Sequence, residues 1–203
     1  WLENAANRFN QIDPAKTEDQ WLPNASEAAV QPGASFPGST FDVVTSADIR
    51  YEIDVTQPKY NVNHPAQGGE RIRNLTYKGL PMDSAQQFIV ATNNYRANSS
   101  APFILGTGKA FDIVWAAPDA NREVVLNYVK AKKTITRAAN GSTSSWRFAK
   151  VATTGKVLFK SAPNELAVAQ AAGLTHISVD RADDSGVNGG DGSYSIYRIA
   201  LEQ

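Results

Sequence analysis

The sequence predicts an α+β fold in which mixed β-sheets pack with a few helices. Between Ile49 and Val55, apolar and polar residues alternate, which is typical of a strand with one buried face and one solvated face. After Pro118, in contrast, apolar residues recur at the spacing of a helix, at Val125 and Val129. Helices interspersed with hairpin-connected strands favour an α+β architecture.

Composition narrows the class of protein. The chain has 203 residues, of which 20 are basic and 20 acidic, so its formal net charge is zero. That balance provides no long-range attraction for a polyanion, so we expect no binding to nucleic acid polymers, although a single nucleotide remains possible. The absence of cysteine excludes disulfides and thiolate metal sites. Because the sequence has no run of 18 apolar residues, we also expect no membrane-spanning segment.

The first half of the chain predicts one helix followed by strands. Trp1, Ala5 and Phe9 recur every four residues, so residues 1–12 have the pattern of the last turns of a helix. Because this pattern is already present at Trp1, we expect the helix to begin upstream and the domain to be truncated at its N-terminal edge. Strands are predicted at 41–56, 72–77 and 88–92, and the last is a continuous apolar run that suits a strand buried on both faces.

The second half predicts two helices and further short strands. The first helix can open at Pro118-Asp119, and its last turn, Lys130–Lys133, is basic, as the helix dipole favours. The second helix is predicted to start at an N-cap, Asn164, and to end at Gly173. Strands are predicted at 111–115, 146–151, 157–159, 177–179 and 194–201.

The sequence contains no recognisable catalytic motif. Its two histidines are His64, in a polar loop, and His176, in a predicted short strand, and neither has a second histidine within a helical turn. There is no GxSxG motif for a nucleophilic serine. We therefore predict no catalytic residue and no metal ligand in this chain, and interpret both histidines as structural or surface residues.

Two glycine-rich stretches resemble ligand-binding loops in composition but not in spacing. Gly106–Lys109 departs from the phosphate-binding loop because Ala110 stands where that motif has Ser or Thr. Asp183–Gly192 fits neither the EF-hand spacing nor the calcium-binding nonapeptide repeat. We interpret the first stretch as a turn and expect no metal at the second.

A polar cluster at the end of the apolar run 88–92 is the best candidate for a binding site. An aromatic ring such as that of Tyr95 can stack on a nucleobase, which contributes about 1–3 kcal/mol per base. The amides of Asn93 and Asn94 can bind base edges or a ribose, and Arg96 can hold a carboxylate or phosphate. The alternative interpretation is a strand end with a partly buried tyrosine and no ligand.

Five segments together resemble the C-terminal domain of the 5'-nucleotidase family. They are FNQIDP at 9–14, FDVV…IRYEIDVTQP at 41–58, ERIRNLTYKGLPMD at 70–83, FIVATNNYRA at 88–97 and AAPDANR at 116–122. Within the family they are most similar to bacterial bifunctional 2',3'-cyclic-nucleotide 2'-phosphodiesterase/3'-nucleotidases. The similarity covers about residues 1–146, and ATNNYRA is its most specific piece.

The resemblance implies that residues 1–203 form the nucleotide-recognition domain of a larger periplasmic hydrolase. In such enzymes an N-terminal metallophosphoesterase domain binds two divalent metal ions and hydrolyses the phosphoester. The C-terminal domain sandwiches the base between two aromatic rings. Tyr95 matches the second ring, whereas the first falls upstream of Trp1.

The resemblance extends to the neighbours of this ring but not further. Asn93, Asn94 and Arg96 are expected to contact the nucleotide. After the aromatic residue the family often has a glycine pair, and this chain instead has Asn98–Phe103. Because other residues do not allow the close backbone approach of glycine, the contacts of the family are carried no further than Arg96.

Three functions from different classes are compatible with the sequence. We favour the recognition domain of a nucleotide hydrolase, inactive by itself, whose partners are the nucleotide and the metal-bearing domain of the same polypeptide. A stand-alone periplasmic nucleotide-binding module without catalysis is the alternative, although the helical pattern at Trp1 counts against it. The third is a structural domain with no site. A membrane partner is not expected.

Overall fold

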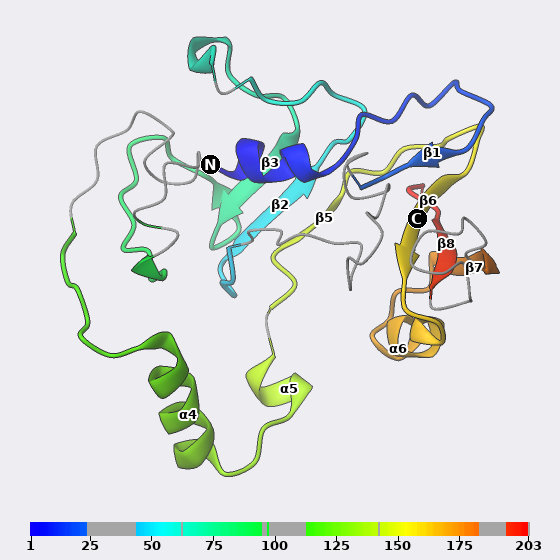
Figure 1. Cartoon of the computed structure of the whole chain (residues 1–203). Helices are drawn as coiled ribbons and strands as arrows, with labels where there is room; N and C mark the ends of the chain where they lie inside the picture. Colours follow the sequence, from blue (N-terminus) through cyan, green and yellow to red (C-terminus); the bar gives the residue numbers. More distant parts are fainter. Residues whose placement is uncertain are drawn as a thin grey trace.

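Two β-sheets form the body of the molecule (Figure 1). The structure, a computed structural model, describes residues 1–23, 44–61, 63–94, 97, 113–141, 143–182 and 194–202. Among these residues each sheet has four strands, and the strands pair both in parallel and antiparallel. Together with the helices, this arrangement confirms the predicted α+β class.

The first sheet is built around the alternating segment that the sequence predicts as a strand. Its strand order is β4 (Leu80–Pro81), β3 (Ile72–Tyr77), β2 (Ile49–Ile53) and β5 (Trp146–Phe148). β3 runs antiparallel to β2 and β4, whereas β5 joins β2 in parallel. Tyr51, Ile53 and Val55 are all buried, so the period of two does mark the buried face.

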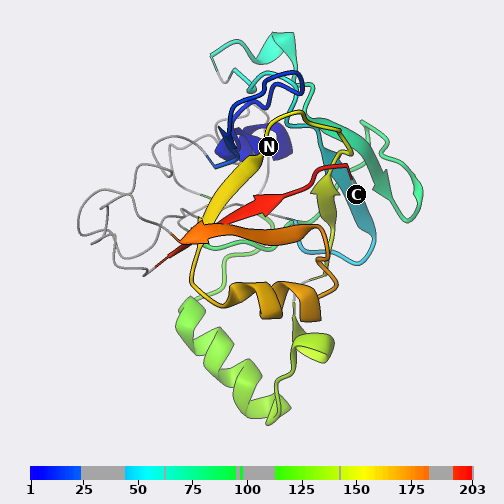
Figure 2. The same cartoon turned by 90° about the vertical axis from the view of Figure 1, so that its right-hand side faces the viewer.

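The second sheet brings together the start and the end of the chain. Its strand order is β1 (Gln20–Trp21), β6 (Val157–Ser161), β8 (Ser195–Ile199) and β7 (Ile177–Ala182). β8 is antiparallel to β6 and β7, and β1 is parallel to β6. Figure 2 shows the three longer strands above α6 (Glu165–Ala171). The strands predicted in this part of the chain are confirmed.

A cluster of buried apolar side chains joins the two sheets. Ile53 and Val55 from the first sheet meet Val157 and Ile199 from the second in this cluster. Full burial of one such side chain contributes about 1.5–3 kcal/mol. The core therefore depends on residues about 100 to 150 positions apart in the sequence.

The N-terminal helix is shorter than the predicted span of residues 1–12. α1 covers Leu2–Ala5, and a 3₁₀ turn, η1, covers Ala6–Arg8. The backbone then leaves the helix because it pairs elsewhere: the Asn10 N–H donates to the Leu22 carbonyl at 2.7 Å. Tertiary hydrogen bonds have replaced the helical ones that the local pattern favours.

A buried arginine holds this N-terminal segment on the first sheet. Arg71 is fully buried, and its Nη1 donates to the carbonyls of Ala6 and Phe9, both at 2.8 Å. Its Nε donates to the Gln57 carbonyl at 2.9 Å. Burial lowers the pKa of Arg71 from its ordinary value. Because three carbonyls from two segments share one guanidinium, its removal would leave these carbonyls without that donor.

Two strands predicted for the middle of the chain are wrong. Residues 88–92 and 113–115 lie outside both sheets, and Ile89 is 85% and Val114 72% exposed. The other two residues of the predicted strand 111–115 lie outside the described part. An apolar run becomes a strand only where it pairs with a sheet edge, and neither of these two runs pairs with a strand among the described residues.

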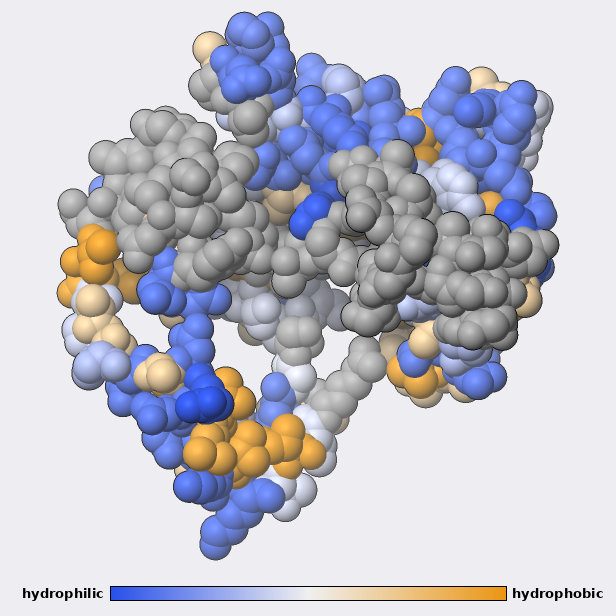
Figure 3. Space-filling view, in the orientation of Figure 1, coloured by the Kyte–Doolittle hydropathy of each residue, from blue (hydrophilic) through white to orange (hydrophobic). Residues whose placement is uncertain are grey.

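The predicted helix after Pro118 is confirmed as α4, Asn121–Lys132, with Lys130 and Lys132 in its last turn. It contains no buried residue, and Figures 1 and 2 both show it below the two sheets. Apolar side chains gather on the surface in this part of the molecule (Figure 3). Its apolar residues therefore follow helical spacing, but each of them stays partly exposed to solvent.

The remaining helices are short. They are η2 (Pro65–Gln67), α5 (Arg137–Asn140) and α6, which the sequence predicts with an N-cap at Asn164. Asn164 does precede α6, but it has a left-handed backbone and its side chain makes no capping hydrogen bond. In the part of the chain that the structure describes, no helix has the length and apolar character needed to cross a membrane.

Candidate functional site

The structure describes two of the four residues predicted to contact a nucleotide. Asn93 is half-buried and Asn94 is exposed at the surface, and Tyr95 and Arg96 lie outside the described residues. The Asn93 carbonyl accepts a hydrogen bond from the Ala97 N–H at 3.0 Å. Both asparagines are thus accessible at least in part, and accessible polar groups can meet a ligand.

A tight hairpin starts the approach to this candidate site. β3 and β4 are joined by Lys78 and Gly79, whose φ angles of 51° and 80° are both positive, as a type I′ turn requires. Glycine adopts this backbone without strain, whereas Lys78 does so at some cost. A second turn follows at Asp83, whose side chain accepts from the Ala85 N–H at 2.9 Å.

An aromatic contact then returns the chain to the sheet. The Phe88 ring meets the Tyr77 ring edge to face, with centroids 5.1 Å apart. The Lys78 ammonium lies 5.2 Å from the centroid of the Tyr77 ring, so Tyr77 contacts a cation as well. This small cluster of Tyr77, Lys78 and Phe88 was not predicted, because the two rings lie on opposite sides of a hairpin and a turn.

The Tyr77–Phe88 contact connects the segment that precedes the candidate site to the first sheet. Hydrogen bonds made by residues 84–92 are local: Gln86 N–H donates to the Asp83 carbonyl, and Gln86 Nε2 to the next carbonyl along the chain. Phe88 is 42% exposed, compared with 85% for Ile89. Within residues 84–92, which the structure describes, the ring contact of Phe88 therefore links the segment to the first sheet.

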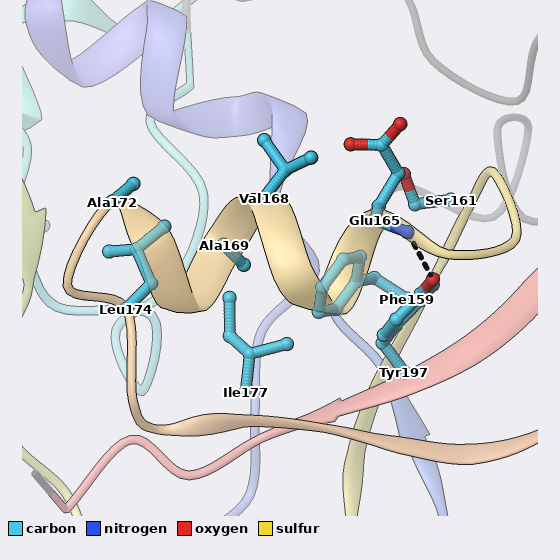
Figure 4. Close-up of a pocket in the computed structure, with 9 residues that line it drawn as sticks. All are labelled: Phe159, Ser161, Glu165, Val168, Ala169, Ala172, Leu174, Ile177 and Tyr197. Carbon is cyan, nitrogen blue, oxygen red and sulfur yellow. Dashed lines mark hydrogen bonds between the residues drawn. The ribbon is translucent and has the colours of Figure 1, made fainter.

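An apolar groove lies elsewhere, between α6 and the second sheet (Figure 4). Its volume is about 210 Å³. The rings of Phe159 and Tyr197 stack at its floor with centroids 5.5 Å apart, and Leu174 and Ile177 point into it. Tyr197 Oη accepts from the Glu165 N–H at 3.2 Å and donates to the Ala162 carbonyl at 2.7 Å, so the phenol fixes the start of α6.

Two clusters of charged side chains lie on the sheets. On the first sheet, hydrogen bonds from Arg147 and Asn74 hold the pKa of the Glu52 carboxyl below its usual value. On the second, the Lys156 ammonium, 2.7 Å from Asp180, does the same for the pKa of that carboxyl, with Arg181 beside it. Both carboxylates already have cationic partners, so we interpret these clusters as structural ion pairs.

Metal binding is the remaining chemistry to test on the structure. Within the described ranges, no three or more His, Cys, Asp and Glu side chains come together in a group that could hold a metal ion. His64 lies in a turn before η2, and His176 lies in the turn before β7 rather than in a strand as predicted. The loops 106–109 and 183–192 fall outside the described residues.

A comparison with known protein families identifies the class of protein to which the chain belongs. The model of the family described as "5'-nucleotidase, C-terminal domain" matches residues 4–105, which include all four predicted contact residues. The chain belongs to this family. No solved structure matches the chain.

Several curated proteins are similar to the chain. It is 34% identical over its whole length to the trifunctional nucleotide phosphoesterase protein YfkN of Bacillus subtilis, of which it covers 12%. It is also 34% identical over its whole length to a 2',3'-cyclic-nucleotide 2'-phosphodiesterase/3'-nucleotidase of Salmonella typhimurium, of which it covers 30%. An enzyme of the same name from Yersinia enterocolitica is 38% identical over 73% of the chain, which covers 22% of that enzyme. The chain therefore spans less than a third of the length of these relatives.

Proposed function

We propose that the chain is the nucleotide-recognition domain of a metal-dependent 2',3'-cyclic-nucleotide 2'-phosphodiesterase/3'-nucleotidase. The observation that carries this proposal is the 34% identity over the whole chain to the Salmonella typhimurium enzyme of that name. The family match through residue 105 supports the same assignment, because it contains the segment 93–96.

The proposed recognition chemistry uses four adjacent side chains. The phenol ring of Tyr95 stacks on the base, which contributes about 1–3 kcal/mol. Asn93 is half-buried and Asn94 is exposed. Their side-chain amides donate hydrogen bonds to base edges or ribose hydroxyls and accept hydrogen bonds from them. Arg96 supplies a charged fork for a phosphate. The aromatic contact between Tyr77 and Phe88 supports this segment from the sheet side.

The proposed division of labour assigns hydrolysis to a metallophosphoesterase domain of the same polypeptide. Two divalent metal ions bound there would supply a hydroxide nucleophile and neutralise charge on the phosphate. The described residues of this chain offer no cluster of metal ligands, so its own contribution is to bind the base and orient the ester. Orientation of this kind can lower a barrier by several kcal/mol. We also propose a periplasmic location, on the family resemblance.

The proposal is tested with the full polypeptide that carries this chain. Hydrolysis of adenosine 3'-monophosphate and of 2',3'-cyclic AMP is measured for wild type, Tyr95→Ala and Tyr95→Phe. Loss of stacking should lower kcat/KM for Tyr95→Ala about 5- to 100-fold, mostly through KM, and Tyr95→Phe should keep most of it. Tyr128→Ala, an exposed tyrosine on α4, is the matched control and should change kcat/KM less than twofold.

Two results would contradict different parts of this proposal. If Tyr95→Ala behaves like Tyr128→Ala, the segment at 93–96 is not the base-binding site. If the 203-residue chain alone releases phosphate when a divalent metal is added, catalysis does not belong to another domain. Tight nucleotide binding by the chain alone, from a gene that encodes no phosphoesterase domain, would instead identify a stand-alone binding module.

A further inference from the structure

A shallow hollow with basic and hydroxyl side chains lies on the edge strand of the second sheet. Its volume is about 250 Å³, and its polar walls are Thr175, His176, Ser178 and Arg198. Of these residues, His176 is half-buried and the other three are exposed. β7 stands at the end of the strand order of this sheet, so the hollow opens at an edge of the sheet.

The strand register places three of these side chains, those of His176, Ser178 and Arg198, on one face. Ser178 of β7 lies directly opposite Arg198 of β8, and the Ala200 N–H donates to the His176 carbonyl at 2.9 Å, which continues the ladder to His176. Side chains directly opposite each other lie about 5 Å apart at Cβ, and residues two apart on one strand lie about 7 Å apart on the same face. His176, Ser178 and Arg198 therefore project beside one another on the face where the hollow lies.

The donors in this hollow are not committed to other groups. Across the described ranges, no hydrogen bond or ion pair joins the side chain of His176 or Arg198 to another residue. No carboxylate of the residues that the structure describes lines the hollow. The acidic neighbour on β7, Asp180, is already paired with Lys156 and Arg181. The local potential is therefore positive, although the chain as a whole has no net charge.

We propose that this hollow binds a phosphate group, with Arg198 as the principal donor and His176, Ser178 and Thr175 completing the contacts. A guanidinium presents two parallel N–H donors to two phosphate oxygens, and hydroxyls donate to the remaining oxygens. The strands β7 and β8, whose residues line the hollow, lie on the opposite side of the molecule from residues 82–94 (Figure 1). The hollow is thus a second site, and it does not depend on the proposed recognition of a base at Tyr95.

The two histidines of the chain provide a direct readout. Imidazole signals are followed by NMR while sodium phosphate is added to the protein at fixed pH, with ionic strength held constant by sodium chloride. Phosphate should shift the His176 signal saturably and leave the His64 signal in place, because His64 lies in an exposed loop outside the hollow. Adenosine and adenosine 3'-monophosphate are titrated in parallel.

The three parallel titrations also show whether the phosphate group comes from a nucleotide or from free phosphate. A stronger response to adenosine 3'-monophosphate than to phosphate means that the site takes a nucleotide phosphate, and an equal response means that it takes free phosphate. Adenosine alone should leave His176 unchanged. Absence of a saturable His176 shift with both phosphate compounds, or an equal shift of His64, would overturn the proposal.

Two variants test the assigned donors. Arg198→Gln should raise the Kd for phosphate about tenfold or more, because it removes a charged bidentate donor, and Ser178→Ala should raise it about threefold. Arg122→Gln, an exposed arginine on α4, is the matched control and should leave the Kd unchanged. Equal Kd values for all three variants and wild type would overturn the assignment of Arg198. If Arg198→Gln does not fold, Ser178→Ala still tests the site.

Discussion

The two-sheet body and the middle of the chain use apolar residues in opposite ways. In the body, Ile53 and Val157 are fully buried although they are far apart in the sequence. In the middle, Val114 is 72% exposed and Val125 on α4 is 61% exposed. The two regions have similar apolar patterns in the sequence, and only one of them has a partner sheet among the described residues.

This difference shows that the spacing of apolar residues is enough to form a helix or strand but does not ensure that the element is buried. α4 has the spacing and the terminal charges of a good helix, and these local preferences are enough for its hydrogen bonds. β2 also depends on strands from other parts of the chain, since each of its edges needs a partner. Stability should therefore be concentrated in the body and be low around α4.

The largest expected effect is the loss of stability when a core side chain of the two-sheet body is removed. Ile53→Ala removes a fully buried side chain from between the sheets and should lower the free energy of unfolding by about 2–5 kcal/mol. Val125→Ala on α4 should change it by less than about 0.5 kcal/mol, because the side chain is already 61% exposed. Urea unfolding of both variants measures the two values. Equal losses would mean that α4 is packed as firmly as β2.

A smaller effect on stability, at alkaline pH, is expected from the buried hydroxyl of Tyr51. Tyr51 is buried, its hydroxyl has no hydrogen-bond partner among the described residues, and burial raises its pKa to about 12 from an ordinary value of 10.0. Because the folded pKa is the higher one, this stabilisation is complete below pH 10 and is lost as the pH rises toward 12, by roughly 2–3 kcal/mol.

Tyr51→Phe isolates that effect. The variant should lack this part of the alkaline loss, and near pH 7 it should be as stable as wild type or more so, because a buried hydroxyl without a partner is removed. Thermal unfolding at pH 7, 10 and 11 provides the comparison. A phenylalanine variant that is less stable than wild type at pH 7 would show that the hydroxyl has a partner.

The smallest expected effect is on nucleotide binding, and it concerns the contact between the first sheet and the segment that follows it. Phe88→Ala removes the ring contact with Tyr77, which contributes about 1 kcal/mol, and should weaken nucleotide binding by the segment at Asn93 about fivefold. Ile89→Ala is the control, since that side chain is 85% exposed. Calorimetric titration with adenosine 3'-monophosphate measures both. If Ile89→Ala weakens binding as much as Phe88→Ala, the ring contact does not support the binding segment.

The candidate site was only partly predictable. The cluster at Asn93 and Asn94 follows from residue chemistry and from the family resemblance, and the structure places both residues at the surface. The support from Tyr77 was not predictable, because it depends on how a hairpin and a turn fold back on each other. The hollow at Arg198 was missed for the same reason: its residues come from two strands whose register no local pattern reveals.

By itself, the sequence determined the α+β class, the family, α4 and α6 and the alternation of β2, because these follow from local spacing and residue type. Tertiary structure decided the burial of Arg71, the early end of the N-terminal helix and the exclusion of residues 88–92 from a sheet. Local preferences differ by about 1 kcal/mol or less per residue. The final arrangement was therefore decided by which distant segments pair in the sheets and make the buried hydrogen bonds.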